Sequence, residues 1–197
     1  MEPTPPALAD AGRPVLGSRP MSVSHPRALA APPGELVVLT RSLVDAVAEA
    51  SRASPRQRII QPFHKHDDEP LHRMLNVLQP DSYVRPHRHL APPKSECWVV
   101  LRGALAFFTF EEEGRVRDCL HLEAGGERFG VDLVPGPFHG LFALVPDTVL
   151  FEVKNGPYAP TTDKSFAPWA PEEGSPGARD YLRGLREEYR RRHPERT

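Results

Sequence analysis

The sequence predicts a mostly-β, single-domain protein in which short strands form a barrel or sandwich between an N-terminal helix and a short C-terminal helical tail. Two observations predict this class. Eight apolar runs of four to seven residues follow one another between residues 73 and 154, separated by Gly, Pro, Asp and Asn, and such close spacing is typical of β-barrels and sandwiches. The 197 residues, 39% of them hydrophobic, suffice for one buried core but are few for two domains.

Three segments are expected along the chain. Residues 1–34 are rich in Pro and Ala without apolar periodicity, so we expect a disordered leader. Residues 35–174 should hold a helix and the barrel. In the helix, Thr40 is the expected N-cap, Leu43, Val44 and Val47 share one side, and Pro55 prevents continuation. Residues 175–197 should form a charged helical tail.

The expected strands start after a polar connection. They cover residues 73–78, 82–85, 97–101, 104–110, 116–121, 131–134, 141–145 and 149–154. The charged turn at residues 111–115 predicts a hairpin whose flanking strands alternate in a way that suits one buried face. Trp98 is expected in the core or at an interface, on the strand face opposite Glu96.

Charge and cysteine content exclude several classes of protein. The 25 Lys and Arg nearly balance the 26 Asp and Glu, which gives no reason to expect a nucleic-acid or membrane partner. Cys97 and Cys119 are the only cysteines, too few for a disulfide framework. Because no apolar stretch approaches the roughly 20 residues of a membrane span and no signal peptide is evident, we expect a cytoplasmic location.

A pair of histidines is the first sign of a candidate metal site in the sequence. His87 and His89 are two residues apart, so on a strand both rings project from the same face. Glu96 follows after six residues, and Gly103 after six more. Downstream, the Pro135-Gly136 turn aims His139 into the same interior. Three imidazoles and one carboxylate suit one divalent metal, and two octahedral positions would stay open for substrate, water or oxygen.

These residues resemble the motifs of the cupin superfamily. Its first motif is G, five residues, HxH, three or four residues, E, six residues and G, and its second ends PxGxxH. This chain departs from them at Asp81 and Val134, which replace the first Gly and the Pro, and in the longer gap before Glu96. The resemblance implies a double-stranded β-helix, or jelly-roll, barrel that binds metal through His87, His89, Glu96 and His139.

Over roughly residues 40–174 the chain also resembles the WbuC-type cupin metalloproteins. The resemblance lies in residues 54–56, 83–89, 151–158 and 166–171. It implies a helix-plus-cupin architecture and metal binding, and it places related proteins among bacterial surface-polysaccharide genes. Their reaction is not established, so the resemblance informs fold more than function.

Several polar residues are candidates for substrate binding. Arginines cluster where the barrel mouth should lie, and guanidinium groups suit carboxylates or phosphates, although surface ion pairs are an equal alternative. Glu152 and Lys154 share a strand face and could form an ion pair or present an acid and a base. A histidine near position 64 is implied by the family resemblance. The predicted set is Arg73, Arg58, His64, Tyr83, Glu152 and Lys154.

The function expected is that of a metalloprotein acting on a small anionic or sugar-derived substrate. The metal could be Fe, Mn, Zn or Ni, and the reaction that of an isomerase, a lyase or an oxygenase. One alternative is a barrel that binds or senses a small molecule without turning it over. Another is a sugar epimerase-like barrel that needs no metal. By analogy with barrels that pair through edge strands, we expect a homodimer.

Overall fold

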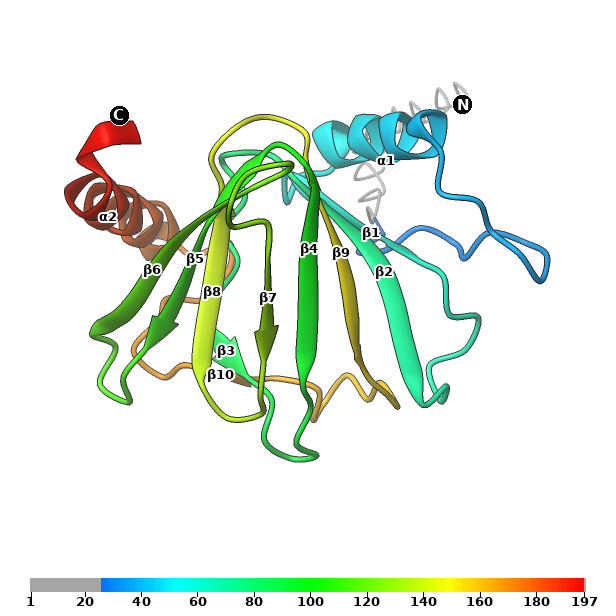
Figure 1. Ribbon diagram of the computed structural model, residues 1–197. Coiled ribbons are helices and arrows are strands. Elements are labelled where there is room, and N and C mark those ends of the chain that lie inside the picture. Colours follow the sequence, from blue (N-terminus) through cyan, green and yellow to red (C-terminus); the bar gives the residue numbers. More distant parts are fainter. Residues whose placement is uncertain (1–25, 197) are drawn as a thin grey trace, which may run out of the picture.

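Two antiparallel five-stranded sheets face each other in the computed structural model, which describes residues 26–196 (Figure 1). The first sheet has the order β1 (Arg58–Pro62), β2 (Leu71–Leu78), β9 (Thr148–Asn155), β4 (Glu96–Arg102) and β7 (Gly130–Leu133). The second has the order β10 (Ser165–Phe166), β3 (His87–Arg88), β8 (Phe138–Ala143), β5 (Ala104–Phe110) and β6 (Val116–Glu123). The chain crosses repeatedly between the sheets, and the expected mostly-β, cupin-like barrel is confirmed.

An apolar core fills one end of the space between the sheets. Its buried members come from both sheets: Leu78, Trp98, Val100, Leu105, Phe107, Leu122, Leu141, Ala143 and Leu150. They alternate along each strand with residues of the outer face, as strand geometry requires. This core fixes how the sheets lie relative to each other.

Helices cover part of the outer face of each sheet (Figure 1). Helix α1 (Arg41–Ala53) packs Val47 and Ala48 against β1 and β2. Helix α2 (Pro176–Arg192) packs Leu182 and Leu185 against the second sheet, and a short 3-10 turn, Pro194–Arg196, follows it. Each face would otherwise expose apolar side chains to water.

The cover by α2 corrects the prediction for the hairpin of β5 and β6. All seven residues of β5 are buried, although one buried face was expected. Phe107 and its same-face neighbours fill the interior, while Phe108 and Phe110 lie in the cluster that α2 completes. The second buried face thus depends on a helix about 70 residues further along the chain.

Helix α1 begins where the sequence predicted. Thr40 is its N-cap, and the Thr40 hydroxyl accepts a hydrogen bond from the Leu43 amide at 3.2 Å. The strand predictions hold for most of the barrel, with exceptions at residues 82–85, at β1 and at β10. Residues 82–85 form no strand, and the Tyr83 carbonyl accepts a hydrogen bond from the Arg58 side chain at 2.7 Å. Strand β1 was missed because its Arg, Gln and Pro residues obscure the apolar pattern.

Residues 1–25 of the predicted leader lie outside the described residues. In the described remainder, the Leu29 amide donates to the Ile60 carbonyl at 2.8 Å, so this segment runs beside β1. Across residues 26–196, no helix combines the length and the apolar character needed to cross a membrane.

Candidate metal centre

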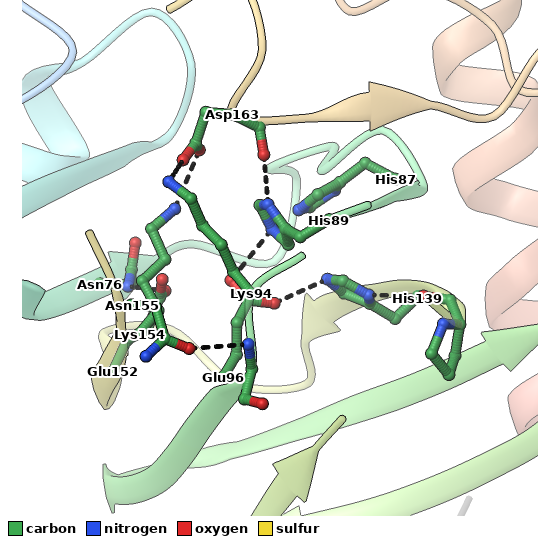
Figure 2. Close-up of polar contacts among 12 residues, drawn as sticks. Asn76, His87, His89, Lys94, Glu96, His139, Glu152, Lys154, Asn155 and Asp163 are labelled. Atoms are coloured by element: carbon green, nitrogen blue, oxygen red, sulfur yellow. Dashed lines mark hydrogen bonds and ion pairs between the residues drawn. The ribbon is translucent and has the colours of Figure 1, made fainter. Parts of the chain in front are cut away.

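Four buried side chains converge at the other end of the barrel interior (Figure 2). His87 on β3 lies opposite His139 on β8 in the strand register, and His89 follows His87 on the same strand face. Glu96 reaches them from β4 in the facing sheet. One nitrogen or oxygen atom from each of these four residues lies within 4.8 Å of the others. The group therefore joins the two sheets across the interior.

Backbone carbonyls fix the orientation of all three imidazole rings. The Nδ1 atom of His87 lies 2.9 Å from the Arg85 carbonyl, and that of His139 lies 3.0 Å from the Pro137 carbonyl. The Nδ1 atom of His89 is hydrogen-bonded to the Asp163 carbonyl. Because a carbonyl only accepts, each Nδ1 carries the hydrogen, and each neutral ring then directs the lone pair of its Nε2 elsewhere.

These lone pairs meet the carboxylate of Glu96. The Nε2 of His89 lies 3.1 Å from one Glu96 oxygen, and the Nε2 of His139 lies 3.0 Å from the other. Three of these four atoms lack a hydrogen-bond partner among the described residues: both Nε2 atoms and Glu96 Oε2. Buried acceptors that face one another without a hydrogen are unfavourable. A cation between them would remove the conflict.

The spacing of these atoms suits a divalent transition metal. Metal–nitrogen and metal–oxygen bonds of about 2.1 Å at right angles separate neighbouring ligand atoms by about 3 Å. The separations of 3.0 and 3.1 Å from Glu96 agree with that value. The residues present therefore fit the metal that the sequence predicts at His87, His89, Glu96 and His139.

The protonation states of the ligands also suit a metal. Burial, together with the charge of Lys164 and contact with His139, lowers the pKa of His87 well below its usual range. Burial alone would raise the pKa of Glu96, but hydrogen bonds and positive charge from His139 and His89 lower it well below its usual range when no metal is bound. A metal would replace the protons of these rings, because a neutral imidazole and an ionised carboxylate are the forms that coordinate metals.

A cavity of about 110 Å³ adjoins the four-residue group. Its lining combines three of the ligands, His87, Glu96 and His139, with other polar residues and the indole of Trp98. Lys164 and Arg58 supply positive charge there, and Glu152 supplies a carboxyl group. The Trp98 Nε1 hydrogen is buried without an acceptor among the residues that the structure describes. A ligand with acceptor oxygens would satisfy it.

Glu152 and Lys154 are both buried (Figure 2). Glu152 lines the cavity, and Lys154 lies opposite Glu96 in the register of β9 and β4. Asn76 donates to a Glu152 oxygen at 2.7 Å. Burial and the nearby charge of Glu96 raise the pKa of Glu152. Lys154 pairs with Asp163 at 2.9 Å, and no direct ion pair between Glu152 and Lys154 occurs within residues 26–196.

The other predicted substrate-binding residues lie in different settings. Arg58 lines the cavity and pairs with Glu173 at 2.6 Å. Arg73 pairs with Glu69 at 3.1 Å on the far side of β2. The His64 ring stacks on His72 with 3.9 Å between centroids. The Tyr83 hydroxyl donates to the Pro171 carbonyl at 2.9 Å. Of these four, Arg58 alone is among the cavity residues in the described part of the chain.

Sequence reasoning missed five residues near the ligands: Asn76, Lys94, Trp98, Asp163 and Lys164. Trp98 lies in the core as expected, but the strand face predicted for it was wrong, because residues two apart on a strand share a face and Trp98 points inward with Glu96. For the lysines a signal existed. The chain has four lysines among its 25 basic residues, and three of the four lie at this end of the barrel.

Comparisons with known proteins give limited further information. The model of a family described as a domain of unknown function (DUF6016) matches residues 39–122, fewer than half of the chain. No curated protein matches. The strand order and the four-residue group of His87, His89, Glu96 and His139 together identify the architecture. The fold is a cupin-like barrel.

Several solved structures are loosely similar to this barrel. A mutant of Bacillus subtilis oxalate decarboxylase is 17% identical with a TM-score of 0.40, and the match covers 50% of this chain and 24% of that chain. KdgF from Halomonas sp. is 19% identical with a TM-score of 0.41, over 55% of this chain and 84% of that one. This chain thus spans about a quarter of the decarboxylase, and such low scores carry no functional argument.

Proposed function

We propose that this protein is a mononuclear metalloenzyme that binds one divalent transition metal and acts on a small anionic substrate. The observation that carries the proposal is the group of His87, His89, Glu96 and His139, in which buried acceptor atoms converge without hydrogens between them. When bound, the metal would supply a Lewis acid with open coordination positions, and Fe, Mn, Zn or Ni all suit three imidazoles and a carboxylate.

The charges around the cavity support an anionic substrate. The cavity lining holds four basic side chains, Arg27, Arg56, Arg58 and Lys164, and two carboxyl groups, Glu96 and Glu152. A divalent metal would add two further positive charges to this excess. An anion that enters the cavity reduces this excess, and the cost of separated charge is high in such a medium.

The residues of the cavity have distinct parts in this proposal. Lys164 would contact an anionic group, and the Trp98 Nε1 hydrogen would be donated to an acceptor oxygen. Glu152, held by Asn76 at 2.7 Å, would exchange a hydrogen bond or a proton with a hydroxyl group. Its raised pKa, caused by burial and by Glu96, suits a group that both holds and releases a proton.

The resemblance to WbuC-type proteins supports a sugar-derived anion as the substrate and a role linked to surface-polysaccharide synthesis. The predicted homodimer and cytoplasmic location stay predictions. An isomerase, a lyase or an oxygenase would each use the same ligand set, so the reaction is best found by a screen of products.

The proposal is tested with protein loaded with cobalt(II), whose visible absorption reports on changes in coordination. We expect millimolar acetate, oxalate and glucuronate to change the spectrum, and neutral glucose to leave it unchanged. Anions without effect, or glucose with an equal effect, would contradict an anionic ligand. Product analysis by NMR then separates the alternatives, because a non-catalytic binding barrel would bind anions and leave them intact.

A further inference from the structure

A strap of residues 156–167, which follows β9 and includes β10, crosses the metal end of the barrel. Lys94 fixes its start, since the Lys94 ammonium donates to the Pro157 carbonyl at 2.5 Å. Strand β3 fixes its end, where Phe166 pairs with His87 and the Ala167 amide donates to the Pro86 carbonyl at 2.9 Å. The strap is thus held against β3, which carries His87 and directly precedes His89.

Asp163, in the middle of the strap, makes three buried contacts (Figure 2). One carboxylate oxygen lies 2.7 Å from the Lys94 ammonium and the other lies 2.9 Å from the Lys154 ammonium. The Asp163 carbonyl accepts the hydrogen bond from Nδ1 of His89. The side chains of Asp163, Lys94 and Lys154 are 2%, 1% and 6% exposed. We call these three residues the clamp.

The clamp holds the Asp163 carbonyl in place from two directions. Lys94 precedes β4 and Lys154 lies on β9, so the two ammonium groups come from different segments and meet on one carboxylate. Buried charge-assisted hydrogen bonds are strong and directional, and the loss of one partner leaves an unpaired buried charge. Movement of Asp163 away from His89 would break both ion pairs.

We propose that the clamp makes Asp163 a positioning residue for His89. The Asp163 carbonyl fixes the tautomer and the direction of the His89 imidazole, and it thereby sets the affinity of the site for its metal. The inference rests on the proposed metal site. A group that orients a metal-binding histidine typically changes metal affinity by 10- to 100-fold when it is altered. The clamp acts through the carbonyl of residue 163, and the carboxylate holds that carbonyl.

The first variant is Asp163→Asn, which keeps the size of the side chain and the backbone carbonyl. We expect the affinity for cobalt(II) or zinc(II), measured by competition with a chelator, to fall by roughly tenfold or more. The visible spectrum of the cobalt(II) form should also change, because His89 would no longer be held in one direction. The control is Asp147→Asn, an equal change at the opposite end of β9, where Asp147 pairs with Arg52.

A second variant separates positioning from charge. Asp163→Asn removes a negative charge, so simple repulsion could also weaken the binding of a cation. Lys154→Met removes a positive charge near Glu96, and a purely electrostatic effect would therefore tighten metal binding. The clamp predicts the opposite result, weaker binding, because Asp163 loses one of its two anchors. Lys154→Met also decides the question if Asp163→Asn does not fold.

The outcomes distinguish this inference from the proposed function. Weaker metal binding in both clamp variants, with Asp147→Asn unchanged, supports the clamp. Tighter or unchanged binding in folded Lys154→Met overturns the clamp and leaves the metal site intact. Wild-type protein that takes up no metal after reloading overturns both.

Discussion

The two ends of the barrel interior differ in polarity although the same strands build them. On β4 the inward residues run from Glu96 through Trp98 to Val100, and on β8 they run from His139 through Leu141 to Ala143. Each strand therefore begins as part of the site and ends in the core. The metal ligands are held on rigid strands whose positions the apolar end determines.

Substitutions at the two ends of the barrel should therefore have different physical effects. At the apolar end, the lost side-chain volume decides the effect of a substitution. At the polar end, the effect depends on which partner is left without its counterpart. Substitutions at the apolar end should therefore reduce stability, and substitutions at the polar end should chiefly change what the protein binds.

The largest effect is expected for His139→Ala at the polar end. The variant removes a ligand that lies 3.0 Å from Glu96, so metal content measured by elemental analysis should fall from one equivalent to background. His121→Ala serves as the control, since His121 on β6 contacts the Tyr189 hydroxyl under α2. Metal retained in full by His139→Ala would show that His139 is not a ligand.

The next effect is expected for Leu105→Ala at the apolar end. Leu105 is 1% exposed within the core between the sheets, and the change leaves a cavity there. The free energy of unfolding of the metal-free protein, measured with urea, should fall by about 3 kcal/mol. Metal content per folded molecule should stay at the wild-type value. A Leu105→Ala variant that has normal stability but binds no metal would contradict this difference between the two ends of the barrel.

A smaller effect is expected for Lys164→Met in the cavity. Lys164 lines the cavity beside His87, and no hydrogen bond or ion pair ties its ammonium within residues 26–196. The affinity of the cobalt(II) protein for oxalate should fall by about tenfold, the loss expected for one charge-assisted contact. Lys65→Met, in an exposed loop, is the control. Equal affinity in all three proteins would remove Lys164 from the site.

The smallest effect is expected for Glu173→Gln, at a carboxylate that pairs with the cavity residues Arg56 and Arg58. Burial alone would raise the pKa of Glu173, but the guanidinium groups of Arg56 and Arg58 lower this pKa to about 2. A carboxyl group whose pKa is lower in the folded protein than in the unfolded chain stabilises the fold at pH values above the unfolded-state pKa. This stabilisation is lost as the pH falls through the folded-state pKa. The variant should therefore be less stable at pH 7, and its deficit should vanish between about pH 4.5 and 2. A deficit independent of pH would contradict this account.

Much of the candidate centre could be predicted from the sequence because its signals are local. The spacing of His87 and His89 reflects strand periodicity, and Thr40 marks the start of α1. The clamp could not be found in this way, since Asp163 lies 69 residues from Lys94 and 74 from His89, and such pairs depend on the assembled sheets. The burial of both faces of β5 likewise depends on α2.

The most direct test of the central claim is the metal stoichiometry of the wild-type protein. After reloading with manganese(II), iron(II), zinc(II) or nickel(II) and removal of unbound ions, elemental analysis should give about one equivalent of one metal per chain. Anomalous scattering should then place that atom between His87, His89, Glu96 and His139. Less than about a tenth of an equivalent of every metal, or an atom bound elsewhere, would contradict the account.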